Sequence, residues 1–516
     1  MPIGSALCCA ILFGAAQPGP EDSDLKTVAE KSDWQATATY DEVVQLLDRL
    51  ARRSPIVRLD SMGTTVEGRS IPLVVLANPP LETAAQARGT GKVIVLAIGN
   101  IHAGEVCGKE ALLMLARSLA LDPDNPLLDD VILLLVPIYN ADGNDRMSPD
   151  NRPGQVGPLR GMGQRPNAQG LDLNRDHVKL ESPEAVALVR LLTQWDPHLT
   201  IDTHTTNGSH HRYALTYAAP LNPSGPSGPI EYLNEVLLPE VTTALRRRTG
   251  YETFFYGNLD AELTEWRTYS SLPRFGGPYR GLRGQMSILS EAYAYASYRD
   301  RVQATLEFVR EILWFAAANR DRILDIAAQA RRETIQAGLE PQPDDAVGIR
   351  HRHAAFDAAV SIKGLGQDHR VVHMGRFEPT RTVRRPWAYI IDPGQANVIA
   401  KLREHGIVIE PFDGTASVEV YTVTDLTRQK EPFQGHHLVT LETDTSVRRR
   451  TFHDAVLVRT AQPLGTLAVY LLEPESADGL VAWNFFDDGL VIDAEFPVYR
   501  IRSAADVVTG AQKQAQ

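Results

Sequence analysis

The chain has 516 residues, which exceeds one typical domain and favours two. Its 43% hydrophobic and 22% charged residues are ordinary for a globular protein. Its formal net charge of −12 argues against a general nucleic-acid binder, whose surface would be basic. Beyond the N-terminus, no segment has the roughly 20 uninterrupted apolar residues of a membrane span.

The N-terminus resembles a secretory signal peptide. Residues 3–16 are apolar, end in small residues and meet two prolines. No basic segment precedes them, so the signal is atypical, and an apolar tail without a targeting role is the alternative. We expect residues 1–20 to direct export to the periplasm or the outside of the cell.

Two of the three cysteines, Cys8 and Cys9, lie in this leader. They raise lipoprotein anchoring as an alternative, although Ala6-Leu7 matches poorly the small residues that precede a lipidated cysteine. Only Cys107 would remain after cleavage, so no disulfide framework is expected within the mature chain.

The next part of the chain alternates between helical and strand patterns. Residues 40–53 carry apolar side chains at helical spacing, whereas residues 93–98 and 131–138 are continuous apolar runs typical of buried parallel strands. Further strands are predicted at 56–61, 70–77, 199–203, 209–217 and 285–290, and further helices at 108–121, 182–194, 230–248 and 298–337. This alternation favours an α/β domain with a mostly parallel sheet.

The pattern changes after residue 337. Residues 338–348 include two prolines and predict a linker. Beyond it, short β-type runs separated by turn residues predict a smaller β-rich accessory domain over residues 349–516. These runs are 371–374, 387–391, 418–423, 437–441, 455–459 and 466–472.

Two side chains with metal-binding chemistry follow the strand predicted at 93–98. His102 and Glu105 are three residues apart on the turn that leaves this strand, so both can bind one cation. Zn²⁺ accepts a neutral imidazole nitrogen and a carboxylate, and a catalytic zinc needs a third protein ligand. Alone the pair is weak evidence, because a surface or helix-capping role explains it more often.

His204 is the candidate for the third ligand. It ends the strand predicted at 199–203, at the sheet edge where ligands bind in α/β proteins. With the first two residues it completes a His₂Glu set of the kind used by catalytic zinc. His210 and His211 are rivals, but adjacent strand residues point to opposite faces, so at most one of them faces the site.

Five motifs then occur in the order of a known family: G-N-I-H-A-G-E, N-A-D-G, D-L-N-R, D-T-H and S-E-A-Y. Over roughly residues 34–332 the chain resembles the zinc carboxypeptidases of the carboxypeptidase A type, peptidase family M14. The resemblance implies a catalytic domain at 34–337, with a mixed, mostly parallel eight-stranded sheet flanked by helices. It also implies one zinc ion per chain, bound by His102, Glu105 and His204.

The D-L-N-R motif supplies three further roles by this resemblance. Asp172 would accept a hydrogen bond from His102 and orient its ring. Asn174 and Arg175 would hold the terminal carboxylate of a substrate, for which a guanidinium is a planar fork. Without the family context, Asp172 would be explained as a turn residue, and Asn174 and Arg175 as residues of a solvated loop.

Glu291 resembles the general base of the family. It would take a proton from the zinc-bound water as that water attacks the scissile carbonyl, and then pass it to the leaving amine. A glutamate that closes an apolar strand is an unusual place for a merely solvated acid. A helix N-terminal glutamate favoured by the helix dipole is the alternative.

Two roles have several candidates. The family uses an arginine in the loop after the N-A-D-G turn to stabilise the oxyanion. We prefer Arg152, which lies nearest the expected offset, with Arg146 second; Arg160 and Arg165 are the remaining arginines of this loop. For the mobile tyrosine that closes over the substrate we prefer Tyr279, in a Gly-rich stretch, although Tyr269 fits the spacing better and Tyr256 also precedes Glu291.

The substrate side chain would bind just before the general base. Arg274, Arg280 and Arg283 occur there, and a basic lining would favour acidic terminal residues. Surface arginines on a loop are an equally good interpretation.

The sequence thus predicts an exported zinc metallocarboxypeptidase that acts on peptides with a free C-terminal carboxylate. One alternative is a zinc amidohydrolase of the same fold that cleaves a peptidoglycan stem peptide or an acyl-amino acid. Another is a non-catalytic binding protein on this fold. The preferred terminal residue, the oligomeric state and the role of the β-rich domain stay open.

Overall fold

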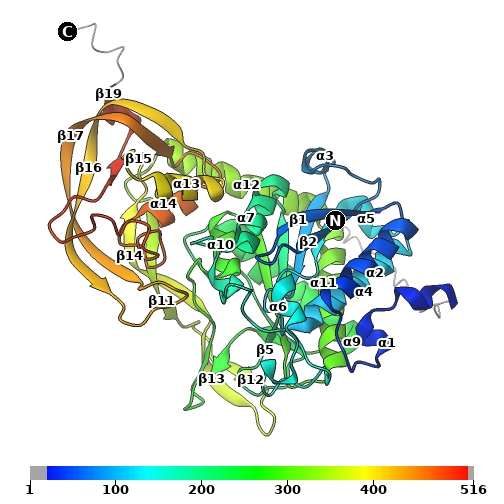
Figure 1. Ribbon diagram of the computed structural model, residues 1–516. Coiled ribbons are helices and arrows are strands. Elements are labelled where there is room, and N and C mark those ends of the chain that lie inside the picture. The colour runs from blue at the N-terminus through cyan, green and yellow to red at the C-terminus, as the bar shows by residue number, and fades with distance from the viewer. Residues whose placement is uncertain (1–19, 509–516) are drawn as a thin grey trace, which may run out of the picture.

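The computed structural model describes residues 20–508 (Figure 1). The predicted signal peptide, with Cys8 and Cys9, lies outside the described residues except for residue 20. Within residues 20–508, none of the helices is both long and apolar enough to cross a membrane.

A mixed eight-stranded sheet forms the centre of the N-terminal domain, in the order β1-β2-β4-β3-β5-β10-β6-β7. The four adjacent strands β4, β3, β5 and β10 are mutually parallel, and so is the pair β6 and β7. This confirms the predicted fold class. The bounds are β1 Val57–Thr64, β2 Ser70–Leu76, β3 Val93–Gly99, β4 Val131–Val136, β5 Leu199–Thr206, β6 Leu215–Ala218, β7 Thr253–Phe255 and β10 Met286–Tyr293.

Helices cover both faces of this sheet (Figure 1). Alternate side chains of a strand point to opposite faces, so β3 contributes to two separate cores. One face packs against α2 (Tyr40–Arg53), α4 (Val106–Ala120), α9 (Leu238–Thr249) and α11 (Tyr298–Ala318). The other packs against α7 (Pro183–Trp195), and this core continues into the C-terminal domain.

The C-terminal domain is β-rich, as predicted. Its largest sheet has the order β17-β15-β18-β16-β19, and the long strands β16 and β17 curve around the outer end of the molecule (Figure 1). Two smaller sheets are β11-β14 and β12-β13-β9-β8, and the second joins strands from both sides of the predicted linker. The bounds are β8 Asn258–Leu259, β9 Glu265–Arg267, β11 Ala346–Ala354, β12 Val360–Ile362, β13 His369–Met374, β14 Arg376–Arg384, β15 Ala388–Ile391, β16 Glu410–Arg428, β17 Val439–Arg459, β18 Val498–Ile501 and β19 Val507–Val508.

Some element predictions were wrong, and one helix was missed. The apolar run at 466–472 is a helix, α14 (Gly465–Leu472), because every one of its side chains is buried and a short apolar run fits a buried helix as well as a strand. The helix α13 (Ala396–Glu404) was not predicted. The helix expected at 298–337 is two helices, since Asn319 (φ −117°) separates α11 from α12 (Arg320–Leu339).

Short helices fill the remaining connections. They are η1 (Pro20–Leu25), α1 (Val28–Lys31), α3 (Ala84–Arg88), α5 (Leu127–Asp130), α6 (Ala141–Asp145), η2 (Pro149–Asn151), η3 (Leu173–Arg175), α8 (Ser227–Tyr232), η4 (Leu233–Leu237), α10 (Gly276–Leu282) and η5 (Ala504–Asp506).

Candidate active site

A cavity of about 240 Å³ lies at the carboxyl ends of β3, β5 and β10. This is the sheet edge at which α/β proteins bind ligands. The parallel register of β5 and β10 sets His204 opposite Glu291. The chain leaves β3 through Asn100, whose left-handed backbone (φ +65°) starts the turn that carries His102 and Glu105.

His102, Glu105 and His204 converge beside this cavity. One ligand atom from each lies within 4.8 Å of the others, and all three residues are buried. The Nδ1 atoms of both histidines lie 3.0 Å from the Glu105 carboxylate, one from each oxygen. Two imidazole nitrogens and one carboxylate oxygen on rigid elements are a donor set that fits Zn²⁺.

The other nitrogen of each histidine faces a carboxylate. His102 Nε2 lies 3.0 Å from Asp172 Oδ1, as expected for a residue that orients the ring. Burial alone would raise the pKa of Asp172, but His102, Arg175 and Arg165 hold it far below its ordinary value. His204 Nε2 lies 3.2 Å from Asp202 Oδ1, without regular hydrogen-bond geometry.

Glu291 lines the cavity as an unusually basic carboxylate. Burial is the largest cause that raises its pKa to about 8, and the negative charge of Glu105 adds to it, while His204 opposes it. A group that takes and returns a proton near neutral pH works best with a pKa in this range.

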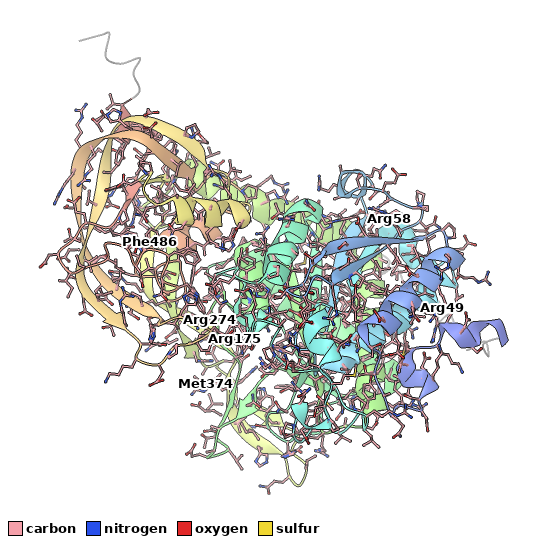
Figure 2. All side chains as sticks on the ribbon, viewed as in Figure 1. Arg49, Arg58, Arg175, Arg274, Met374 and Phe486 are labelled. Carbon is pink, nitrogen blue, oxygen red and sulfur yellow. The ribbon has the colours of Figure 1, made fainter. Side chains whose placement is uncertain are left out.

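Asn174 and Arg175 line the same cavity. Asn174 Oδ1 accepts a hydrogen bond from the backbone of Gly276 at 2.9 Å, and the Arg175 guanidinium stacks 4.0 Å above the Phe275 ring. Burial, together with the nearby charges of Arg165 and Arg274, lowers the pKa of Arg175, although Asp172 opposes this. Figure 2 shows Arg175 and Arg274 together where the two domains meet. Such a cluster of positive charge suits an anionic substrate group.

The structure brings Arg165, and not the predicted Arg152, to the cavity wall. Arg152 contacts a candidate metal ligand instead: it donates to Glu105 Oε1 and to the Thr205 carbonyl, both at 2.7 Å. Arg146 pairs with Glu67 instead. Arg165 donates to Asp172 Oδ2 at 2.8 Å. The D-L-N-R motif lies close in sequence to Arg165 and is the signal that could have pointed to this arginine.

Tyr279 does not reach the cavity either. It is fully buried in α10, and its hydroxyl bonds to His405 Nδ1 at 2.8 Å, because the Gly-rich stretch forms a packed helix rather than a mobile loop. Tyr256 and Tyr269 line the cavity in its place, with their rings 5.6 Å apart. The rival ligand His211 packs against Tyr213 and Tyr293, away from the metal ligands.

All three arginines before Glu291 are buried, so they are not surface arginines on a loop. Arg274 donates from Nε to Asp478 Oδ1 in the C-terminal domain at 2.8 Å. Arg283 donates to the carbonyl of His405 at 2.9 Å. Arg280 donates to Asp202 Oδ2 at 3.0 Å.

Two residues of the site were missed. Asp202 is two residues before His204, and side chains at that spacing share one face of a strand, so this spacing could have revealed it. Gln434, in the C-terminal domain, accepts a hydrogen bond from the backbone N–H of Asp172 at 2.8 Å. No local pattern could have revealed a partner 262 residues away.

Comparison with known proteins gives consistent matches. Residues 43–220 match the family model described as zinc carboxypeptidase. Carboxypeptidase 2 of Trichophyton rubrum is 23% identical over 505 residues, which cover 91% of this chain and 88% of the relative. Carboxypeptidase Z of Mus musculus is 32% identical over 151 residues, which cover 28% of this chain and 22% of the relative.

The solved structures that align with the chain include a metallo-carboxypeptidase from Burkholderia cenocepacia. It aligns at 18% identity over 55% of this chain and 70% of its own, with a TM-score of 0.41. Carboxypeptidase A from Helicoverpa armigera aligns at 17% identity over 57% of this chain and 74% of its own, also with a TM-score of 0.41. The match over residues 43–220 shows that this chain contains a zinc carboxypeptidase domain of peptidase family M14.

Proposed function

We propose that the protein is a zinc-dependent metallocarboxypeptidase that hydrolyses C-terminal residues from peptides. The observation that carries this proposal is that Glu291, Arg175 and the candidate metal ligands meet at one cavity. A binding protein on the same fold would have no use for a half-buried carboxylate whose pKa is raised to about 8, as that of Glu291 is.

His102, Glu105 and His204 would hold the zinc ion, one per chain. The bound ion would supply Lewis acidity, which polarises a peptide carbonyl and acidifies water. Asp172, whose Oδ1 lies 3.0 Å from His102 Nε2, would hold the imidazole proton on Nε2 and leave Nδ1 free as a ligand atom.

Glu291 would take a proton from the attacking water and return it to the leaving amine. Arg165 lines the cavity 3.7 Å from Glu105 and would donate to the carbonyl oxygen as negative charge develops on it. Asn174 and Arg175 would bind the terminal carboxylate, which restricts cleavage to the last residue. Tyr269, at the spacing expected for the substrate-closing tyrosine, would cover the bound residue.

The proposal includes export through residues 1–20. It predicts that the enzyme removes single terminal residues from a peptide library, as read by mass spectrometry, and that a zinc chelator or Glu291→Gln abolishes this. Cleaved muropeptides beside intact peptide termini would favour the amidohydrolase. A zinc-loaded protein that cleaves neither would be a binding protein.

A further inference from the structure

Arg152 forms a bridge between two elements that carry candidate metal ligands. Its Nη1 donates at 2.7 Å to Oε1 of Glu105, the residue directly before α4. Its Nη2 donates at 2.7 Å to the carbonyl of Thr205, which follows His204 in β5. One guanidinium therefore ties a metal ligand to the strand of another metal ligand.

This bridge closes a ring of hydrogen bonds around the Glu105 carboxylate. Glu105 Oε2 accepts from the backbone N–H of Thr205 at 2.9 Å, and the carbonyl of the same residue accepts from Arg152. Each carboxylate oxygen thus has one fixed donor besides the histidine that it faces. A turn of the carboxylate out of this plane would weaken both hydrogen bonds, so the ring fixes its orientation.

Arg152 is itself held in one position. Its Nε donates to Gln155 Oε1 at 2.8 Å, so all three guanidinium nitrogens make hydrogen bonds. Gly104 leaves room for the side chain, because a Cβ on this residue would lie 2.7 Å from Arg152 Cδ. The side chain is only 9% exposed, so water screens its contacts little.

An arginine suits this position for two reasons. Its permanent charge balances the Glu105 carboxylate, a buried charge that would be costly without a partner. Its planar fork reaches a carboxylate and a carbonyl at once, which the single ammonium of a lysine does less well. Arg165 is a weaker partner, because its Nη1 lies 3.7 Å from the same Oε1 and its side chain is 41% exposed.

We propose that Arg152 is a positioning residue that holds Glu105 ready for zinc and so sets the zinc affinity of the site. The inference rests on the proposed carboxypeptidase function, and it gives Arg152 a different role from the oxyanion stabilisation expected from the sequence. Partners that hydrogen-bond a metal ligand contribute about 10- to 100-fold to metal affinity. A positive charge beside the site also repels a cation, so loss of Arg152 would tighten zinc binding if positioning did not matter.

Zinc affinity decides between these two effects. Competition with a chromophoric chelator gives the Kd for zinc of the parent chain, Arg152→Met and Arg152→Lys. We expect Arg152→Met to raise this Kd about 10- to 100-fold, and Arg152→Lys to raise it less, because lysine restores the charge but not the fork. Arg146→Met is the matched control from the same loop, where the arginine pairs with Glu67, and its Kd should stay within about twofold of the parent's.

Cobalt provides a readout that a loss of stability alone would not change. Zn²⁺ is a d¹⁰ ion without visible bands, whereas the visible absorption of Co²⁺ reports the geometry of its ligands. In the folded, Co²⁺-saturated protein, the bands of Arg152→Met should differ from those of the parent chain. The bands of Arg146→Met should coincide with the parent's.

A Kd for zinc in Arg152→Met that equals the parent's or lies below it would overturn the inference, and so would unchanged cobalt bands. If neither Arg152 variant folds, Gln155→Leu decides, because it removes the acceptor of Arg152 Nε and leaves Glu105 in place. A Kd raised about threefold or more in this variant would support the inference, and a smaller change would overturn it. A parent chain that binds no zinc would refute the proposed function, whereas unchanged variants of a zinc-binding parent refute the positioning role alone.

Discussion

The substitution Asp172→Asn tests how strongly the metal site depends on the carboxylate behind it. Asp172 Oδ1 accepts from His102 Nε2 at 3.0 Å and from the backbone N–H of Asn174 at 2.9 Å, while Oδ2 accepts from Arg165 Nε at 2.8 Å. Both oxygens are therefore occupied by donors. An asparagine of the same shape has only one oxygen, so its N–H₂ group must face a donor on one side.

Either orientation of the amide weakens the site. If N–H₂ faces His102, the imidazole must move its proton to Nδ1, which removes the atom that would bind zinc. If N–H₂ faces Arg165, two donors confront each other and a charge-assisted hydrogen bond is lost. Loss of such a supporting partner lowers metal affinity about 10- to 100-fold, or about 1.4–2.7 kcal/mol.

Competition with a chromophoric zinc chelator measures this effect directly. We expect Asp172→Asn to raise the Kd for zinc by 10- to 100-fold, and Asp150→Asn, an exposed carboxylate of the nearby loop, to leave it unchanged. If Asp172→Asn binds zinc within about twofold of the parent protein, the carboxylate does not support the metal ligand, and the reasoning fails.

Three further predictions follow from the same site. Glu291→Gln should lower kcat about 10²- to 10⁴-fold while zinc affinity, measured in parallel, changes little; activity near that of the parent would contradict its role as base. In the zinc-free protein, folded Glu291 retains a proton that the unfolded chain releases above pH 4.5. The free energy of unfolding, measured in urea, should therefore fall as the pH rises from 4.5 to about 8, and this pH dependence should flatten in Glu291→Gln. Gln434→Ala should cost about 1 kcal/mol of stability and weaken zinc binding, because it removes the acceptor of the Asp172 backbone N–H. Gln429→Ala, a change at an exposed residue of the same loop, should do neither. Equal zinc affinities of the two variants would exclude a role for this loop at the metal site.

The sequence predicted best what lies on buried strands. Strand β3 is a continuous apolar run that His102 follows, and β5 and β10 carry His204 and Glu291 near their carboxyl ends, so the three residues could be assigned to one sheet edge from the sequence. The α/β architecture followed from the same runs.

Side chains on loops and short elements were harder to predict. Arg152 and Tyr279 were chosen by offset and glycine content, but which loop residue reaches the cavity depends on tertiary packing. Tyr279 is held in α10 by its contact with His405, which is distant in sequence. The error at α14 has a related cause, because a short run that is apolar on every side has no periodicity to separate helix from strand.

The helix α7 shares a hydrophobic core with the C-terminal domain, and this core limits which fragments of the enzyme can fold and bind zinc. A fragment that ends after α12 would retain every side chain assigned to catalysis, and motif searches would regard it as complete. It would nonetheless expose the apolar surface of α7 that packs against the C-terminal domain. It would also remove the hydrogen bonds that Asp172 makes with Gln434 and Arg274 makes with Asp478. We therefore expect truncated or domain-swapped versions to lose zinc affinity as well as solubility, so that the accessory domain is part of the minimal catalytic unit.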